Sequence, residues 1–394
     1  MDPNSSQMGK PSRSPYALPA TVFAKDRDVD TVMLELKSVV SEIIDEEELR
    51  LLLSTVDNPT AYDGFEPSGR MHIAQGLMKK LVIDKMTKNG FTYLIWIADW
   101  FAMLNGKMDG DLDKIQDVGK YFIEIWKSLS LDMSRVKFLW CSEEINRDHS
   151  SYWGHVMKIS STTSLNRMLR CIDVMGRSIT THNGSDEPSG NLFSSEVKAS
   201  AIMYPAMQCA DIFHLGVDVC QLGLDQRKVN MLAREYASSA KLTPPIVMSH
   251  QMLRGLRVED AKMSKSHPDS AIFMEDDRKT VERKIRSAWC PEKVYQEGEN
   301  KNPVLEYFRI IVFPYLEGEL VTIERLPKNG GTITYQTFNA FLEDYISGAL
   351  HPSDVKVNLA RYINMFLDPV RKHFTDNSEA TELLERVKSY RVTR

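Results

Sequence analysis

The sequence predicts an α/β protein in which a Rossmann-like, doubly wound parallel sheet carries a helical insertion and is followed by a mostly α-helical C-terminal domain. Two patterns predict it. Short apolar segments suited to buried parallel strands alternate with amphipathic helical segments between residues 61 and 247. From about residue 275 onward the apolar spacing is helical, with interruptions near Pro291, Gly330 and Pro352. A chain of 394 residues is long enough for two such domains.

The expected domains follow one another along the chain. Residues 1–30 open with a Ser- and Pro-rich stretch that lacks the apolar run of a signal peptide, so we expect a poorly ordered extension. The Rossmann-like domain is expected over residues 31–270, with the helical insertion at about 145–200. The helical domain is expected over residues 275–394.

The first elements follow from local periodicity. Residues 31–54 carry apolar residues at helical spacing among many charges, which predicts one or two surface helices. A glycine-rich turn then separates a short strand from a helix, as at the start of many nucleotide-binding domains. The elements expected here are a strand around Ala61 and Tyr62, a helix from Met71 to Met86, a strand starting at Tyr93, a helix over 112–130 and a strand over 136–142.

Composition narrows the possible functions. The formal net charge is only -5, so a nucleic-acid partner has to be argued from local patches. The 5 cysteines are scattered without CxxC spacing, which argues against a disulfide framework or a zinc site and favours a reducing, cytoplasmic location. The longest apolar stretch, Leu94 to Leu104, is interrupted by Asp99 and is too short to span a membrane.

Two short segments carry groups that suit phosphate. The segment HIAQG (72–76) lies near the start of a predicted helix, where unpaired N–H groups and the helix dipole favour anions. The segment KMSKS (262–266) offers two ammonium groups and two hydroxyls that can stabilise a departing pyrophosphate. Taken singly, the first is more typical of a surface or capping histidine, and the second is equally typical of a solvated basic loop.

A third pattern suggests a pocket for a small polar ligand. Tyr204, Gln208 and Asp211 are spaced i, i+4 and i+7, which places a phenol, an amide and a carboxylate on one face of a helix. The surrounding segment is strongly apolar, so the polar face is expected to point inward. The alternative is a helix with a solvated polar stripe.

The two phosphate-binding segments, in this order, resemble the paired signatures HIGH and KMSKS of class I aminoacyl-tRNA synthetases. The second signature is intact, whereas Ala74 and Gln75 stand where the first usually has Gly and a second His. The segments YDGFEPSG, YPAMQCADIFHLGVD and LDQRKVNMLARE resemble tyrosyl-tRNA synthetases of the archaeal and eukaryotic type. The resemblance runs from about residue 35 to beyond residue 370.

The resemblance implies roles for particular residues. Those implied in tyrosine binding are Tyr62 and Asp211 for the phenolic hydroxyl, Tyr204, Gln208 and Gln226 for the ammonium group, and Gly64 for close backbone approach. Those implied in ATP binding are His72, Gln75, Gly76, Met263, Ser264 and Lys265, and those implied in catalysis are His72, Lys262 and Lys265. Those implied in tRNA binding are Arg227 and Asp354.

The function implied is that of a tyrosine–tRNA ligase. Such an enzyme forms tyrosyl-adenylate from tyrosine and ATP in a catalytic domain and then charges the 3′ end of tRNA(Tyr), whose anticodon the helical domain binds. Mg²⁺ is expected on the triphosphate, without a protein metal site. The family is usually a homodimer, and no membrane partner is expected. The alternatives are a tryptophanyl-tRNA synthetase, against which Asp211 argues, and a non-catalytic RNA-binding relative.

Basic residues after the KMSKS segment leave two interpretations open. They could contact tRNA phosphates, or they could form a salt-bridged helix face with the interleaved acids. The residues concerned are Arg278, Lys279, Arg283, Lys284 and Arg286.

Overall fold

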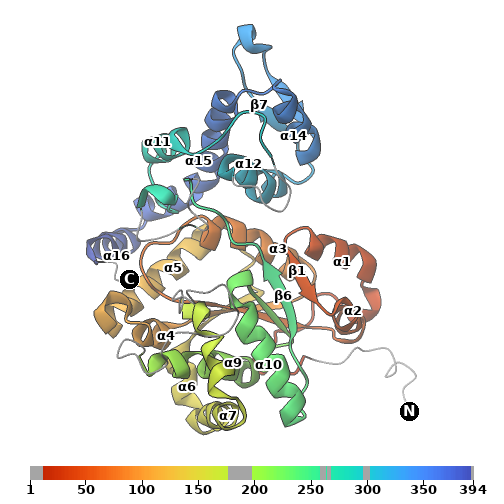
Figure 1. Cartoon of the computed structure of the whole chain (residues 1–394), viewed down its shortest axis with the longest axis vertical. Helices are drawn as coiled ribbons and strands as arrows, with labels where there is room; N and C mark the ends of the chain where they lie inside the picture. The colour runs from red at the N-terminus through yellow and green to blue at the C-terminus, as the bar shows by residue number, and fades with distance from the viewer. Residues whose placement is uncertain (1–11, 176–197, 258–262, 264–267, 296–301, 392–394) are drawn as a thin grey trace. The chain divides into compact units, whose positions relative to one another are not determined.

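The computed structural model describes residues 12–175, 198–257, 263, 268–295 and 302–391 (Figure 1). The chain forms two compact units. Unit 1 comprises Met1–Pro67, Lys85–Gly119 and Asp132–Gln251, and unit 2 comprises Ser68–Asp84, Lys120–Leu131 and Met252–Arg394. The domain bounds expected from the sequence stay predictions.

Unit 1 is built around a six-stranded sheet with the strand order β1-β6-β5-β2-β3-β4. The strands are β1 (Glu42–Ile44), β2 (Thr60–Phe65), β3 (Thr92–Ile97), β4 (Val136–Trp140), β5 (Val219–Gly223) and β6 (Ile246–His250). Neighbouring strands are parallel except for β1 and β6. Every residue of β3 and β5 is buried, as in a parallel sheet that is covered on both faces. The predicted Rossmann-like α/β class is confirmed.

Strand β1 is the main departure from the elements expected in this unit. Residues 31–54, predicted as helical throughout, form α1 (Val29–Lys37), β1 and α2 (Glu46–Thr55). Asp45 adopts the left-handed region at φ 63° and its carboxylate accepts a hydrogen bond from the Glu48 N–H, so a new helix begins there. Ile43 pairs with Met248 at the antiparallel edge of the sheet.

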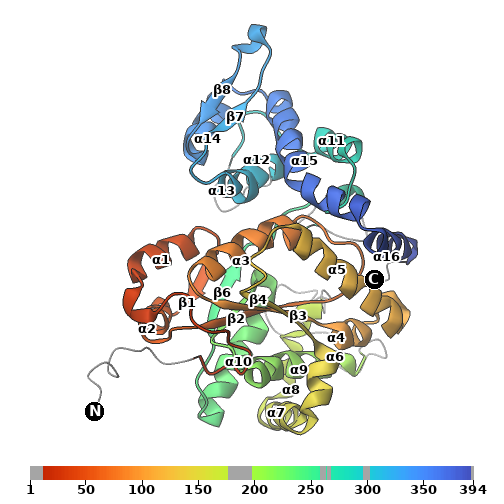
Figure 2. The same cartoon turned by 180° about the vertical axis from the view of Figure 1, so that it is seen from behind.

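The helices of unit 1 cover the sheet, and α7, α9 and α10 lie together on one side of it (Figures 1 and 2). Besides α1 and α2 they are α4 (Asp99–Leu104), α6 (Cys141–Arg147), α7 (His149–Thr162), α8 (Leu165–Leu169), α9 (Ser200–Leu215) and α10 (Arg227–Ala240). Helices α3 (Lys79–Lys88) and α5 (Leu112–Ser128) have residues in both units. Short 3-10 turns occur at Ala24–Asp26, Lys107–Gly110, Ile172–Met175, Leu224–Gln226, Pro268–Ser270 and Pro327–Asn329. Among the described residues, no helix is long and apolar enough to cross a membrane.

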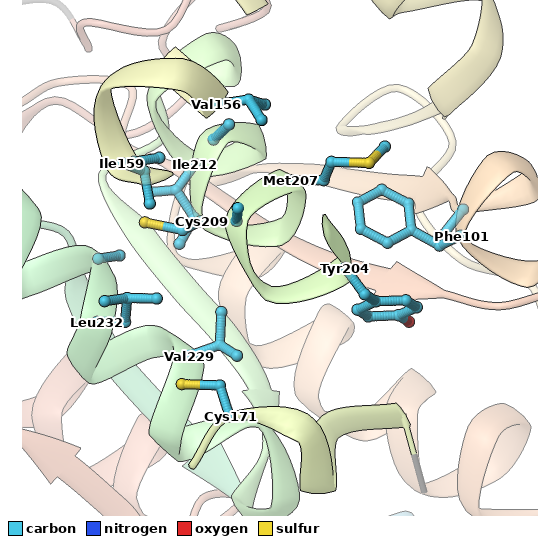
Figure 3. Packing of buried hydrophobic residues seen from close by; sticks show 14 of the residues in the cluster. Phe101, Val156, Ile159, Cys171, Tyr204, Met207, Cys209, Ile212, Val229 and Leu232 are labelled. Carbon is cyan, nitrogen blue, oxygen red and sulfur yellow. The ribbon is translucent and has the colours of Figure 1, made fainter. Parts of the chain in front are cut away.

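The core of unit 1 surrounds helix α9 (Figure 3). Its apolar side chains pack against helices α7 and α10 on either side. The labelled contributors are Val156 and Ile159 from α7, Met207, Cys209 and Ile212 from α9, and Val229 and Leu232 from α10. At the start of α9, the Tyr204 ring meets the Phe101 ring edge to face, with centroids 4.8 Å apart. This packing fixes the helix that carries the predicted pocket residues.

Part of the N-terminal segment, which was expected to be a poorly ordered extension, makes specific contacts with unit 1. From Ser12 to Pro19 the chain is bound across unit 1, and we call this segment the N-terminal strap. The Ser12 hydroxyl donates to Asp218 Oδ2 at 2.5 Å, and the Ser14 hydroxyl donates to the carbonyl of Leu215 at 2.6 Å. Arg135 Nη1 donates to the Pro19 carbonyl at 2.6 Å. Residues 1–11 lie outside the described part of the chain.

Unit 2 is mostly helical beyond residue 275, as predicted. Its helices there are α11 (Arg278–Ser287), α12 (Pro303–Tyr307), α13 (Phe313–Tyr315), α14 (Phe338–Ser347), α15 (Pro352–Asp376) and α16 (Ser378–Ser389). Two short antiparallel strands, β7 (Val321–Ile323) and β8 (Ile333–Tyr335), form a hairpin that Figure 2 shows beside α14. Two π-helical turns, at Ala74–Met78 and Phe308–Val312, complete the unit.

Candidate functional site

The polar face of helix α9 points into the protein. Tyr204, Gln208 and Asp211 are 6%, 7% and 1% exposed, although they interrupt an otherwise apolar helix. A solvated polar stripe is therefore the wrong interpretation. Buried polar groups need hydrogen-bond partners, so each of these side chains indicates either an internal contact or a ligand.

Asp211 lies close to two buried phenols. The Tyr152 hydroxyl, from α7, donates to Asp211 Oδ1 at 2.8 Å. Tyr62, from β2, is 1% exposed, and its hydroxyl has no hydrogen-bond partner within the described part of the chain. Burial raises the pKa of Tyr62, and electrostatic interactions with Cys220 and Asp211 raise it further, so Asp211 lies within electrostatic range of this hydroxyl. An unpartnered buried hydroxyl is costly, and a ligand hydroxyl placed here would relieve that cost.

Burial controls the electrostatics of Asp211 itself. Desolvation raises the pKa of Asp211 well above its usual range, because a carboxylate is poorly stabilised away from water. The polar groups of Tyr152 and Trp96 oppose this rise in the pKa. The ionised form of Asp211 therefore depends on donors supplied by neighbouring side chains.

The remaining pocket residues form a second polar group. The Tyr204 hydroxyl donates to Glu66 Oε1 at 2.6 Å, and Asn105 Nδ2 donates to the same oxygen at 3.0 Å. Gln208 Nε2 donates to Gln226 Oε1 at 3.0 Å. A carboxylate, a phenolic oxygen and amide oxygens are all acceptors, so this group suits an ammonium ion.

Sequence reasoning missed two of these contacts. Glu66 lies in the YDGFEPSG segment, but its carboxylate was assigned no role, and its contact with Tyr204 joins residues 138 positions apart. Tyr152 lies inside the predicted insertion, 59 residues before Asp211. The sequence spacing around these residues does not reveal either contact, because each contact depends on how α9 packs against another element.

The first signature begins its helix later than expected. Residues 71–73 pair with the segment that follows the second signature: Ile73 N donates to the Ile272 carbonyl at 2.9 Å, and Met274 N donates to the Met71 carbonyl at 2.9 Å. His72 forms an antiparallel bridge with Phe273. The helix predicted from Met71 instead starts with the π turn Ala74–Met78, because pairing holds His72 in an antiparallel bridge and the backbone turns helical only at Ile73.

A buried carboxylate network holds this pairing in place within unit 2. Glu275, whose side chain is 2% exposed, forms an ion pair with Arg70 and accepts a hydrogen bond from the Tyr121 hydroxyl at 2.7 Å. The Met71 N–H donates to the Tyr121 hydroxyl oxygen at 3.2 Å. Side chains and backbone thus both position His72.

Of the second signature, KMSKS, the structure describes only Met263. Met263 is 5% exposed, and its N–H donates to the Leu253 carbonyl at 3.1 Å. Lys262, Ser264, Lys265 and Ser266 lie outside the described residues.

The two candidate glycines differ in what surrounds them. A Cβ added at Gly64 would meet only the Trp96 side chain, at 3.6 Å, which is an ordinary contact. A Cβ at Gly76 would lie 2.2 Å from the Met274 sulfur. Gly76 is therefore needed for packing against Met274, whereas packing does not explain the glycine at position 64.

This difference gives a paired prediction. Gly76→Ala should destabilise the protein by about 1–3 kcal/mol, the usual cost of overpacking. Gly64→Ala should leave stability nearly unchanged but slow adenylate formation, because a methyl group there would obstruct the ligand. Thermal unfolding and pyrophosphate exchange measured on both variants test this. Equal melting temperatures for the two variants would contradict the packing argument.

The residues assigned to tRNA binding lie at the surface. The Arg227 side chain is 45% exposed, and its Nε lies 2.8 Å from Glu42 Oε2. Asp354, in the first turn of α15, accepts a hydrogen bond from Asn329 Nδ2 at 3.5 Å. In α11, Arg278 pairs with Asp368, Arg283 with Asp269 and Lys284 with Asp276, which favours the salt-bridged interpretation of that cluster.

Comparison with known proteins identifies the family. The model of "tRNA synthetases class I (W and Y)" matches residues 55–368. The cytoplasmic tyrosine–tRNA ligase 1 of Arabidopsis thaliana is 49% identical over 94% of this chain and 92% of its own length. The tyrosine–tRNA ligase of Sulfolobus acidocaldarius is 35% identical over 88% of this chain and 94% of its own length.

A solved structure agrees with both relatives. The Leishmania major tyrosyl-tRNA synthetase in complex with tyrosinol superposes with a TM-score of 0.84 and 43% identity. It matches 93% of this chain, which spans 61% of that longer chain. The protein therefore belongs to the class I tRNA synthetases for tryptophan and tyrosine, in the tyrosyl-tRNA synthetase branch of archaea and eukaryotes.

Proposed function

We propose that this chain is a tyrosine–tRNA ligase that forms tyrosyl-adenylate from tyrosine and ATP and then charges tRNA(Tyr). The observation that carries the proposal is the buried pair of Asp211 and the unpartnered Tyr62 hydroxyl. A phenol is both a donor and an acceptor, so it can satisfy a carboxylate and a second hydroxyl at once.

Recognition of the amino acid follows from these groups. The phenolic hydroxyl of the substrate donates to Asp211 and accepts from Tyr62. Phenylalanine leaves both polar groups without a partner, and so it is rejected. The ammonium group is held by Tyr204, Gln208 and Gln226. The Tyr204 hydroxyl donates to Glu66, and a hydroxyl that donates to a carboxylate becomes a stronger acceptor.

The chemistry is positioning and charge stabilisation. The tyrosine carboxylate attacks the α-phosphate of ATP, pyrophosphate leaves, and a terminal ribose hydroxyl of the tRNA then attacks the activated carbonyl. We assign His72, Lys262 and Lys265 to stabilising the phosphates in the first step. Gln75, Gly76, Met263 and Ser264 complete the proposed nucleotide-binding set.

Magnesium is assigned to the triphosphate. Among the described residues, no three His, Cys, Asp or Glu side chains gather as metal ligands. Mg²⁺ commonly binds through substrate phosphates and water with few protein ligands, and it would add positive charge where pyrophosphate departs.

The partners proposed are tRNA(Tyr) and a second copy of the chain. Arg227 is assigned to the acceptor stem and Asp354 to the anticodon. A homodimer is proposed because the family is usually dimeric, and exposed apolar side chains on α7, α8 and α9 are available to such an interface. These side chains are Met157 (65% exposed), Leu165 (50%), Ile202 (40%) and Met203 (40%). The cytoplasm is the proposed location, as in the name of the Arabidopsis relative.

Pyrophosphate exchange assayed with three amino acids tests the proposed function. We expect exchange of label between pyrophosphate and ATP to depend on tyrosine, with phenylalanine and tryptophan giving little. If exchange depends on tryptophan and not on tyrosine, the substrate is tryptophan and the proposed function is wrong. A folded protein inactive with all three amino acids would favour the non-catalytic RNA-binding relative.

A further inference from the structure

Tyr152 is a buried residue that the proposed reaction leaves without a role. It lies on α7, is 0% exposed, and its hydroxyl is within hydrogen-bonding distance of both Asp211 Oδ1, at 2.8 Å, and the Met207 carbonyl, at 3.1 Å. A phenol has one proton to donate. The carboxylate is the closer and the charged acceptor, so it takes that proton, because charge-assisted hydrogen bonds are the stronger ones.

The surroundings make this hydrogen bond important for Asp211. Among the described residues, several groups that interact electrostatically with the carboxylate are neutral at physiological pH and come from different elements. They are Tyr62 on β2, Trp96 on β3, Cys141 at the start of α6, Tyr152 on α7, and Tyr204 and Cys209 on α9. Burial raises the pKa of Asp211 and so favours the protonated carboxyl. Hydrogen-bond donors lower that pKa and favour the ionised form.

We propose that Tyr152 is a positioning residue for amino-acid selection, whose hydroxyl holds Asp211 as an oriented, ionised acceptor. An ionised carboxylate can only accept hydrogen bonds, so the group that meets it has to donate. With one oxygen occupied by Tyr152, the other is left for the ligand. The inference rests on the proposed function, because it explains how Asp211 discriminates between ligands.

The site is expected to prefer a ligand whose hydroxyl donates a hydrogen bond, because of the direction of the hydrogen bonds around Asp211. Tyr152 donates to Asp211, the substrate hydroxyl donates to Asp211, and Tyr62 donates to the substrate oxygen. O-methyltyrosine can accept from Tyr62 but cannot donate to Asp211, and phenylalanine can do neither. A protonated Asp211 would itself be a donor, so it would tolerate the methyl ether and blur this selection.

Tyr152→Phe isolates the hydroxyl from the ring. The ring packs edge to face against His214 and Trp153, with centroids 5.4 and 5.8 Å away, and phenylalanine keeps those contacts. Tyr236→Phe is a matched control, since Tyr236 is also buried at 4% exposure but its hydroxyl contacts His155, at 3.3 Å, and not Asp211. Both variants remove one buried hydroxyl from the same unit.

The experiment measures equilibrium binding of tyrosine, phenylalanine and O-methyltyrosine by calorimetry between pH 5.5 and 8, together with the rate of adenylate formation at saturating tyrosine. In Tyr152→Phe we expect tyrosine binding at pH 7 to weaken about tenfold or more, with discrimination against O-methyltyrosine reduced. A tenfold loss corresponds to a shift of about one pKa unit. The saturated rate should change little, as should all properties of Tyr236→Phe.

The pH dependence has a defined sign. Tyrosine binds the ionised carboxylate, so affinity falls as pH falls through the pKa of Asp211. Without the Tyr152 hydroxyl that pKa is higher, so the loss of affinity moves to higher pH than in the wild type. An unchanged pH profile and unchanged discrimination in Tyr152→Phe would overturn the proposal. Equal weakening of all three ligands would overturn it as well, by showing a purely structural role. Wild-type protein that fails to bind tyrosine would instead refute the proposed function.

Discussion

Asp211→Ala is expected to weaken tyrosine binding by about 1–3 kcal/mol while weakening phenylalanine binding less, so that selectivity falls by roughly tenfold or more. The carboxylate is 1% exposed and accepts one hydrogen bond from Tyr152, so a ligand that donates a second hydrogen bond stabilises it further. Phenylalanine makes no such bond, so it loses nothing when the acid is removed. Titration calorimetry with both amino acids on the purified variant measures the two changes.

The same variant should remain stably folded. Removing Asp211 relieves the cost of burying a carboxyl, and the Tyr152 hydroxyl still has the Met207 carbonyl at 3.1 Å as an acceptor. We therefore expect a melting temperature no lower than that of the wild type in the absence of ligand. A folded variant that loses tyrosine and phenylalanine affinity in equal proportion would remove Asp211 from hydroxyl recognition.

Asp276→Ala is expected to produce the largest loss of stability, about 3–5 kcal/mol in unit 2, because it leaves a buried ammonium group without its counter-charge. Lys284 is 3% exposed, and its Nζ lies 2.6 Å from Asp276 Oδ2. Asp276 also forms an ion pair with Arg70 and accepts from the Phe273 N–H at 2.9 Å. One substitution thus removes three contacts that hold the segment paired with the first signature.

Lys284→Met is the matched control for this loss. It should cost less than Asp276→Ala, because Asp276 keeps Arg70 and the Phe273 N–H as partners. The double variant should be more stable than Asp276→Ala alone, since no buried charge is then unpaired. Hydrogen exchange of the amides in α11 and residues 70–76 reports on this unit separately. A double variant no more stable than Asp276→Ala would show that the unpaired lysine is not the cause.

Periodicity predicted most of the fold because the central strands and helix α9 are governed by local patterns. β3 and β5 are buried throughout and largely apolar, which is the pattern of central strands in an α/β alternation. Prediction failed where tertiary contacts override the local signal. β1 is three residues long and depends on β6, more than 200 positions later. The helix expected from Met71 is delayed by pairing with Ile272–Met274, for which no local pattern exists.

In the candidate site, too, residues on one helix were predicted from the sequence, whereas residues from other elements were not. The spacing of Tyr204, Gln208 and Asp211 predicted one buried helical face, because three residues on one helix obey its geometry. Glu66 and Tyr152 come from other elements, so only folding brings them to that face. Roles for Lys262 and Lys265 stay predictions carried by family resemblance. For Gly76 the structure adds a packing role against Met274 that the sequence did not indicate.

The N-terminal strap has a consequence for synthesis on the ribosome. Ser12 binds Asp218, which lies 206 residues later in the chain, and Arg13 binds the carbonyl of Thr243, 230 residues later. At translation rates of about 5–20 residues per second, Ser12 waits roughly 10–40 s before its partner has been made. The strap therefore leaves the ribosome well before the residues that bind it have been made. Until then the amino ends of β2 and β5, where Thr60 and Asp218 lie, are left open to the chaperones that meet nascent chains.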